Sequence, residues 1–481
     1  MVNMQHGQLG IGRWSILINN GRWRPRNFDI LIIELLQYAL QGRVSKVLLS
    51  VPRRHGKSTL ISRNFASYFL SHFPNDNVIL SSYSQMLASQ FGKDCKNIIK
   101  EYGSLSPYHV ELAEDSKANN KFNMKSPYVG RMLAVGAAGS IMGFGANLFI
   151  IDDPIKSPKE AASKTIQFNL EEWIEGVAKT CLETRTNGLP PIMIVIAQRL
   201  NINDLHGIIK KNEPYIGAKK AFEILRKGGS IPPDTWVDFN LPAICEDPTT
   251  DLLGRKKDEV LWKEQRSYEW LMAEKKAMGS YLFNAIYQGE PIEREGHIFK
   301  RNWFENCIIS SKDVPANLPT IRYWDFAASG EEGDSTAGLL TSWNGETLYI
   351  MDLVYGKFTA SQVERKFKQT TKKDGKHVVQ LIEQEPGSGS KILINHLQHD
   401  PDLRGHTILA DKVKENKIVR SFDLEVLSDS RQVKMVNSWW NERFVNQLVS
   451  FTGEEGNPDD IVDTGTGSAR YWRKPKARIF V

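Results

Sequence analysis

The stretch SVPRRHGKSTLIS, residues 50–62, decides how this sequence can fold. Gly56, Lys57 and Ser58 complete the second half of the phosphate-binding pattern G-x-x-x-x-G-K-[ST], while Val51 stands where its first glycine belongs. In such a loop, backbone N–H groups at a helix N-terminus surround the phosphates and the lysine adds positive charge. A surface loop that contains GKS by chance is the alternative, and the motif alone does not separate the two.

The segments on either side of this loop favour a nucleotide site. KVLLSV (46–51) has the pattern of an apolar strand and STLISRNFASYFLSHF (58–73) has helical spacing, which is the setting that the motif requires. Further buried strands are expected at NVILSSYS (77–84), LFIIDDP (148–154) and IMIVIAQ (192–198). Strands rich in Ile, Val and Leu that alternate with helices predict a mainly parallel sheet covered on both faces.

The strand at 148–154 ends in two acids, as a Walker B element does. Asp152 would hold Mg²⁺ directly or through water, and Asp153 would polarise the attacking water. Together with the loop, this pattern predicts a P-loop ATPase domain of the ASCE type, with Ser58 and Asp152 as metal ligands. The ATP-binding residues are then expected to be Arg53, Arg54, His55, Gly56, Lys57, Ser58, Thr59 and Asp152.

Two further features bear on hydrolysis. Arg53 and Arg54 lie inside the loop and could place positive charge on the phosphates in the transition state, as an arginine finger does. The alternative is that one of them is an ordinary solvent-exposed cation. Gln198 follows the next strand, where it could sense the γ-phosphate and couple hydrolysis to movement, or could only cap the strand.

The second half of the chain has a different order of elements. Three β-rich runs, TIRYWDFAAS (320–329), STAGLLTSW (335–343) and ETLYIMDLVYG (346–356), are followed by a helix, the strand HVVQLIEQE (377–385) and another helix. This order is typical of a ribonuclease-H-like fold, which is an inference at the level of the fold alone.

The length of 481 residues exceeds what one hydrophobic core supports, so several domains are expected. The composition turns polar and rich in Lys, Gly and Pro between 206 and 260, which indicates a boundary or hinge region. We predict an ATPase domain over 1–240, a linker over 241–312 and a nuclease domain with a basic tail over 313–481. An apolar run of 18 residues is absent and the four cysteines are scattered, which favours a cytoplasmic protein with reduced thiols.

Acidic residues in the second half predict a metal-dependent nuclease site. Asp325 lies among aromatic residues in a β-run, where a carboxylate is costly unless it is paired or metal-bound. Glu383 ends the strand expected beside it, and GNPDDIVD (456–463) places Asp459 and Asp460 at a helix start. Such carboxylates can converge on two metal ions about 3.5–4 Å apart, the spacing of two-metal phosphodiester cleavage. Hard oxygen ligands suit Mg²⁺ or Mn²⁺.

Several assignments stay open from the residues alone. Glu385 lies on the same face of its strand as Glu383, so alternation does not separate them. Asp463 belongs to the same helix start as Asp459 and Asp460. Asp334 is a candidate fourth acid, with a turn role as the alternative. A cluster of bases between the last strand and helix could contact DNA phosphates or form a solvated face: Lys412, Lys414, Lys417 and Arg420.

Together, these motifs resemble those of the large terminase subunit of tailed double-stranded DNA bacteriophages. They occur in that family's order over nearly the whole chain: PRRHGKS, VILSSYSQMLASQFGK, LFIIDDP, IAQR, YQGEPI, YWDFAAS, IEQEPGSG, ADKV and DDIVD. Many members have a Walker A loop with basic residues and without the first glycine, as here. The resemblance implies that Lys57 and Ser58 bind nucleotide, that Asp152 and Asp153 form Walker B, and that the nuclease site is formed by Asp325, Glu383 and Asp460, with Asp459 close by.

The resemblance also implies a function. We expect ATP-driven translocation of double-stranded DNA into a procapsid through a portal, and cleavage of concatemeric DNA, with ATP and Mg²⁺ (or Mn²⁺ at the nuclease site). Expected partners are the portal protein, the small terminase subunit and the procapsid, on which the chain would form a homo-oligomeric ring in the host cytoplasm. An ATP-dependent helicase with an idle DNA clamp and a non-enzymatic DNA-binding adaptor are the rival interpretations.

The chain departs from the family pattern at three places. Phe144 lies within the glycine pair GFG, where many relatives have an arginine that acts on a neighbouring subunit, so the identity of that arginine is open. Gln198 stands where threonine is more usual. The sequence NPDD replaces the common HDD and removes its histidine.

Overall fold

The computed structural model describes residues 10–137, 139–291, 298–326, 335–384, 388–413, 415–453 and 459–474. The chain divides into two compact units, Met1–Ala273 with Tyr281–Glu293, and Glu274–Ser280 with Arg294–Val481. The stretch expected to link two domains, 241–312, is thus shared between the units. Among the described residues, no helix combines the length and the apolar character needed to cross a membrane.

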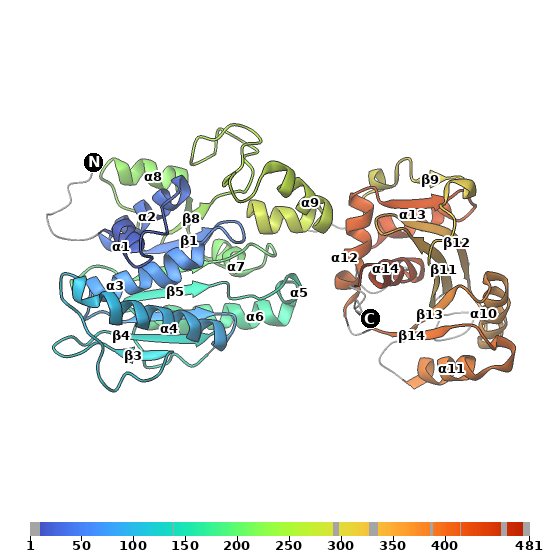
Figure 1. The fold of residues 1–481 in the computed structure, drawn as a ribbon, viewed down its shortest axis with the longest axis horizontal. Helices are drawn as coiled ribbons and strands as arrows, with labels where there is room; N and C mark the ends of the chain where they lie inside the picture. The colour runs from blue at the N-terminus through green and yellow to red at the C-terminus, as the bar shows by residue number, and fades with distance from the viewer. Residues whose placement is uncertain are drawn as a thin grey trace. The chain divides into compact units, whose positions relative to one another are not determined.

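The first unit contains an eight-stranded sheet with helices around it (Figure 1). Its main helices and strands are α1 (Ile11–Leu17), α2 (Asn27–Leu40), β1 (Lys46–Ser50), the π-helical η1 (Thr59–Phe65), α3 (Ala66–His72), β2 (Val78–Ser82), α4 (Gln85–Tyr102), β3 (Lys121–Asn123), β4 (Arg131–Gly136), β5 (Leu148–Asp152), α5 (Pro158–Ala161), α6 (Lys164–Trp173), β6 (Ile192–Ile196), α7 (Leu205–Asn212), β7 (Tyr215–Gly217), α8 (Ala218–Arg226) and β8 (Trp236–Asn240). Helix α9 (Tyr268–Phe283) is divided between the units, with Glu274–Ser280 in the second.

The strand order in this sheet is β3-β4-β2-β5-β6-β1-β8-β7, and every neighbouring pair is parallel except β3–β4. The strands β2, β5 and β6 are buried at every residue, as expected for a parallel sheet with helices on both faces. β6 lies between β1, which precedes the GKS loop, and β5, which ends at Asp152. This order confirms the predicted ASCE-type P-loop fold.

The second unit is built on a seven-stranded sheet. Its elements are β9 (Ile308–Ile309), β10 (Thr320–Asp325), β11 (Thr336–Trp343), β12 (Leu348–Gly356), α10 (Ala360–Asp374), β13 (Val379–Gln384), α11 (Ser388–His399), β14 (Ile408–Lys412), α12 (Lys417–Asp429), β15 (Val433–Val436), α13 (Asn441–Ser450) and α14 (Asp460–Arg473).

The order of this sheet is β14-β13-β10-β11-β12-β15-β9. The pairs β10–β11 and β11–β12 are antiparallel, whereas β13 and β14 run parallel to β10. Helix α14 packs on β10 and β11, and α12 packs against α14. The predicted order of three strands, helix, strand and helix is therefore confirmed, and it brings the start of α14 to the strands that end in acids.

Candidate functional site

The GKS loop connects β1 to a helix, as the motif predicts. Arg54 and Gly56 have left-handed backbone conformations, with φ of 62° and 84°, which turn the chain back toward the sheet. The amide of Leu60 bonds to the carbonyl oxygen of Gly56 at 3.0 Å, so the helix starts directly after the loop. Lys57 is buried in this turn, while Arg53 and Arg54 are exposed. Thr59 is the first residue of η1.

Asp152 ends β5 and faces two hydroxyl groups of the helix that follows the loop. Ser58 Oγ donates to Asp152 Oδ1 at 3.0 Å, and Ser62 Oγ donates to Oδ2 at 2.5 Å. Burial and then the neighbouring charge of Asp153 raise the pKa of Asp152 to about 6, against these hydrogen bonds. A hydroxyl and a carboxylate on a buried strand end are hard oxygen donors, so this group fits a magnesium-type ion.

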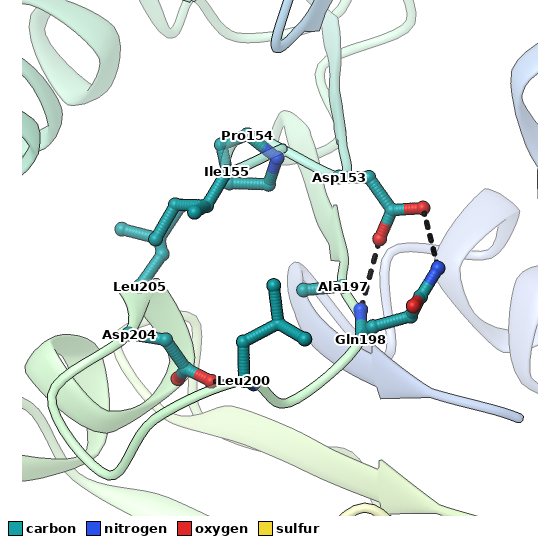
Figure 2. A pocket seen from close by; sticks show the side chains of 8 residues that line it. All are labelled: Asp153, Pro154, Ile155, Ala197, Gln198, Leu200, Asp204 and Leu205. Atoms are coloured by element: carbon teal, nitrogen blue, oxygen red, sulfur yellow. Dashed lines mark hydrogen bonds between the residues drawn. The ribbon is translucent and has the colours of Figure 1, made fainter. Parts of the chain in front are cut away.

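Asp153, the residue after β5, contacts both the phosphate loop and the segment that follows β6. Its backbone has a φ of 45°, which is rare outside glycine and turns the carboxylate into the site. Oδ2 lies 3.4 Å from Nζ of Lys57, and Oδ1 accepts a 2.9 Å hydrogen bond from the amide of Gln198. The Gln198 side chain lies beside the same carboxylate (Figure 2) and accepts a 3.1 Å hydrogen bond from Nε of Arg53.

His55 anchors the phosphate loop in the protein interior. It is 2% exposed, its Nδ1 lies 3.0 Å from the carbonyl oxygen of Arg53, and its ring packs against Phe28 and Trp262. The guanidinium of Arg26 lies over both of those aromatic rings, 4.4 and 4.0 Å from their centroids, and donates to the His55 carbonyl oxygen at 3.3 Å. Burial lowers the pKa of His55 to about 4, so the ring is neutral at pH 7.

An arginine lies next to Phe144, the residue within the glycine pair. The guanidinium carbon of Arg131 lies 4.7 Å from the centroid of the Phe144 ring. Arg131 begins β4, thirteen residues before Phe144 in the chain. The fold thus brings a cation to this loop that its immediate sequence lacks.

The acids of the second unit meet at one end of its sheet. Trp324 on β10 pairs with Ile382 on β13. The residues that follow them, Asp325 and Glu383, therefore lie at the same level near the ends of the two strands. Glu383 also lies opposite Asp411 on β14. Burial raises the pKa of Glu383 to about 7, although the charge of the neighbouring Arg420 opposes this shift.

Helix α14 supplies the remaining carboxylates. Arg420 on α12 binds Glu383 Oε1 through one nitrogen and Asp463 Oδ1, at 3.2 Å, through the other. Lys417 pairs with Asp459 and lies 3.3 Å from Oδ2 of Asp463. Burial also raises the pKa of Asp463. Asp463 is therefore linked to Glu383 through Arg420. Asp460 is the first residue of α14 and is buried.

A tyrosine and an arginine complete this cluster. The hydroxyl of Tyr323 lies 3.3 Å from Glu383 Oε2 and donates to Asp411 Oδ2 at 2.7 Å. Arg470 on α14 binds Asp411 and donates to the Tyr323 hydroxyl at 3.2 Å. Burial raises the pKa of Tyr323 well above its usual value, so the phenol stays protonated and remains a donor.

Some predicted site residues have other environments, and some lie outside the described residues. Lys417 and Arg420, predicted to contact DNA, are engaged in the ion pairs above, and Arg420 is 4% exposed. Lys412 is exposed at the end of β14. Asp334, Glu385 and Lys414 lie outside the described residues.

The sequence reasoning missed several residues of both sites. A signal existed for Ser62, which follows Ser58 by four positions and so lies on the same helix face. A signal also existed for Tyr323, which precedes Asp325 by two positions on one strand. Asp411 lies within the quoted ADKV motif, although only its lysine was considered for a role. Arg26, Trp262 and Arg470 reach their sites from distant parts of the chain, and no local sequence signal indicated them.

The first unit and the second match two different family models. Residues 48–193 match the family described as terminase large subunit, T4likevirus-type, N-terminal. Residues 322–467 match the terminase RNaseH-like domain. Together the two matches cover more than half of the sequence. No curated protein matches the chain.

Solved structures of phage proteins are similar to the chain. A large terminase from a thermophilic bacteriophage has 10% sequence identity and a TM-score of 0.45, over 89% of this chain and 93% of that one. The large terminase of bacteriophage HK97 has 12% identity and a TM-score of 0.38, over 96% and 98%. The nuclease domain of the P22 large terminase has 17% identity and a TM-score of 0.28, over 37% of this chain and 98% of that one.

Proposed function

The chain belongs to the terminase large subunits, and from this premise we propose that it moves double-stranded viral DNA into a procapsid by ATP hydrolysis and cuts concatemeric DNA with a metal-dependent endonuclease. One observation carries the proposal. Each unit has its own charged site. In the first unit, Nζ of Lys57 lies 3.4 Å from Oδ2 of Asp153, the residue after Asp152. In the second unit, Arg420 forms ion pairs with both Glu383 and Asp463.

In the first unit, Lys57 would contact the β- and γ-phosphates and backbone amides after Gly56 would surround them. Ser58 and Asp152 would hold Mg²⁺, which supplies charge neutralisation when bound. Asp153 would orient and polarise the attacking water, and the contacts of its carboxylate with Lys57 and the Gln198 amide support this role. Arg53 would then stabilise the charge that develops on the transferred phosphoryl group.

In the second unit, Asp325 and Glu383 are proposed to hold the metal together with a carboxylate from α14. The sequence favoured Asp460 with Asp459 beside it, whereas the shared contact with Arg420 favours Asp463. All these donors are carboxylate oxygens, which suits Mg²⁺ or Mn²⁺. Bound metal would polarise the phosphodiester and activate water. The chain's own residues would hold the acids together and exclude water from their buried side.

Membership of the family implies contact with DNA and with the packaging machinery. We propose that the specific partners are the portal protein, the small terminase subunit and the procapsid, with the chain assembled as a ring on the portal in the host cytoplasm. The exposed Lys412 beside the acid cluster supports contact with the phosphates of DNA.

Two reciprocal variants test the proposal. Lys57→Ala should abolish ATP turnover and leave Mn²⁺-dependent cutting of a plasmid intact, whereas Asp325→Ala should abolish cutting and leave ATP turnover intact. Each variant is the folding control for the other, since each must keep one activity. ATP turnover that persists in Lys57→Ala would contradict the nucleotide site, and cutting that persists in Asp325→Ala would contradict the nuclease site.

A further inference from the structure

Tyr323 occupies a central place beside the proposed nuclease site although it is not an acid. It lies on β10 two residues before Asp325, so both side chains leave the strand on the same face. The residue is fully buried, and its hydroxyl lies between the carboxylates of Glu383 (3.3 Å) and Asp411 (2.7 Å). A buried phenol that links two carboxylates fixes the direction in which each of them points.

The hydroxyl is itself fixed from the other side. Arg470 donates to the Tyr323 oxygen at 3.2 Å and forms an ion pair with Asp411. The phenol therefore accepts from a cation while its single hydrogen faces the two carboxylates. Charge-assisted hydrogen bonds of this kind are stronger than neutral ones.

The ring of Tyr323 also sets the position of α14. A Cβ atom built on Gly467 would lie 2.2 Å from Cζ of Tyr323, so only glycine permits this contact between helix and ring. Asp463 lies one turn before Gly467 on the same helix. Tyr323 thus orients Glu383 through its hydroxyl and sets the depth of the helix that carries Asp463 through its ring.

We propose that Tyr323, held by Asp411 and Arg470, is a positioning residue that orients Glu383 toward the nuclease metal. This inference rests on the proposed metal-dependent nuclease. In protein metal sites, residues that hold a ligand in place contribute strongly to affinity, and their loss typically weakens metal binding or activity about 10- to 100-fold. A tyrosine that only filled the core would contribute through its ring and not through its hydroxyl.

The variant Tyr323→Phe separates these two roles because it keeps the ring and removes the hydroxyl. Its matched control is Tyr349→Phe, since the Tyr349 hydroxyl on β12 forms a hydrogen bond only with the side chain of Asn344 among the described residues. The full-length proteins would be titrated with Mn²⁺ by calorimetry, and plasmid cutting would be followed as a function of Mn²⁺ concentration. ATP turnover and melting temperature would report on folding.

We expect Tyr323→Phe to raise the dissociation constant for Mn²⁺ about tenfold, with ATP turnover and melting temperature close to those of the wild type. Asp411→Asn should shift Mn²⁺ binding in the same direction, and Tyr349→Phe should not shift it. Wild-type Mn²⁺ binding and cutting in Tyr323→Phe would overturn the inference. If the unmodified chain neither binds Mn²⁺ nor cuts DNA, the proposed nuclease itself fails, and the two failures are thereby distinguished.

Discussion

Asp153 accepts a 2.9 Å hydrogen bond from the backbone amide of Gln198, although the two residues follow different strands, β5 and β6. The Gln198 side chain extends this link, because its oxygen accepts from Nε of Arg53 at 3.1 Å (Figure 2 shows the Asp153–Gln198 bonds). One glutamine therefore connects the arginine of the phosphate loop to the acid proposed to polarise water.

This link predicts that Arg53 and Gln198 act through one contact. Arg53→Ala and Gln198→Ala should each lower ATP turnover about tenfold, which is ~1.4 kcal/mol of activation free energy. The double variant should be little slower than either single variant, since residues in one network are not additive. Turnover numbers of the four proteins and their affinity for ADP provide the measurement. If the increases in activation free energy of the two single variants add up in the double variant, the two residues act independently.

Ser62 should tune the pH dependence of ATP hydrolysis. Its hydroxyl lowers the pKa of Asp152, which burial has raised to about 6. Ser62→Ala should raise that pKa further, so a larger fraction of Asp152 is protonated and unable to hold metal at pH 6.5 than at pH 8. The ATP turnover rate of Ser62→Ala, divided by that of the wild type, should therefore be higher at pH 8 than at pH 6.5.

The control for this prediction is Ser71→Ala. Ser71 is buried on α3, and its hydroxyl has no hydrogen-bond partner among the described residues. Its removal should leave the pH profile of ATP turnover unchanged. A Ser62→Ala profile that is parallel to the wild type at all pH values would contradict the role assigned to this hydroxyl.

The sequence was sufficient to predict elements whose pattern is local. Buried parallel strands form continuous apolar runs, so β2, β5 and β6 were recognisable, and Asp152 was recognisable as an acid at a strand end. The predicted ribonuclease-H-like order was recognisable because its strands and helices follow each other along the chain.

The partners of charged side chains could not be predicted in the same way. Arg420 has the sequence context of a DNA contact, yet the packing of α12 on α14 turns it inward to Glu383 and Asp463, 37 and 43 positions away. His55 is likewise covered by Trp262, more than 200 positions away. Such contacts depend on how distant helices pack, which periodicity within one segment does not report.

His55 should make the protein sensitive to acid. Its pKa is lowered to about 4 in the folded protein, from an ordinary value of 6.5. The unfolded chain therefore binds a proton that the folded chain rejects between these values. The neutral ring contributes fully to the free energy of unfolding above pH 6.5, and this contribution is lost as the pH falls to about 4. At about 1.4 kcal/mol per pKa unit, the contribution is at most ~3 kcal/mol.

The variant His55→Asn tests this effect, because asparagine can keep the hydrogen bond to the Arg53 carbonyl without titrating. Denaturant unfolding at pH 7.5, 6 and 5 would give the free energy of unfolding for both proteins. The wild type should lose more stability than the variant on acidification. Equal losses would show that the neutral ring of His55 does not contribute, although His72, whose pKa burial also lowers to about 4, would still contribute in both proteins.

The acids at the start of α14 should differ in their importance for DNA cutting. Asp463 shares Arg420 with Glu383, whereas Asp459 pairs with Lys417 alone among the contacts above. Asp463→Asn should lower Mn²⁺-dependent cutting more than ~100-fold, beyond the usual effect of residues that only support a metal ligand. Asp459→Asn should lower it by about tenfold or less.

Asp460→Asn supplies the third arm of this comparison, since Asp460 is the acid that the sequence motif favours. ATP turnover should be unchanged in all three variants, because the substitutions lie in the unit that does not contain the phosphate loop. Cutting rates on a supercoiled plasmid at saturating Mn²⁺ give the ranking. A loss confined to Asp460→Asn would mean that the carboxylate at the first residue of α14 binds the metal. The link between Asp463 and Glu383 through Arg420 would then be structural only.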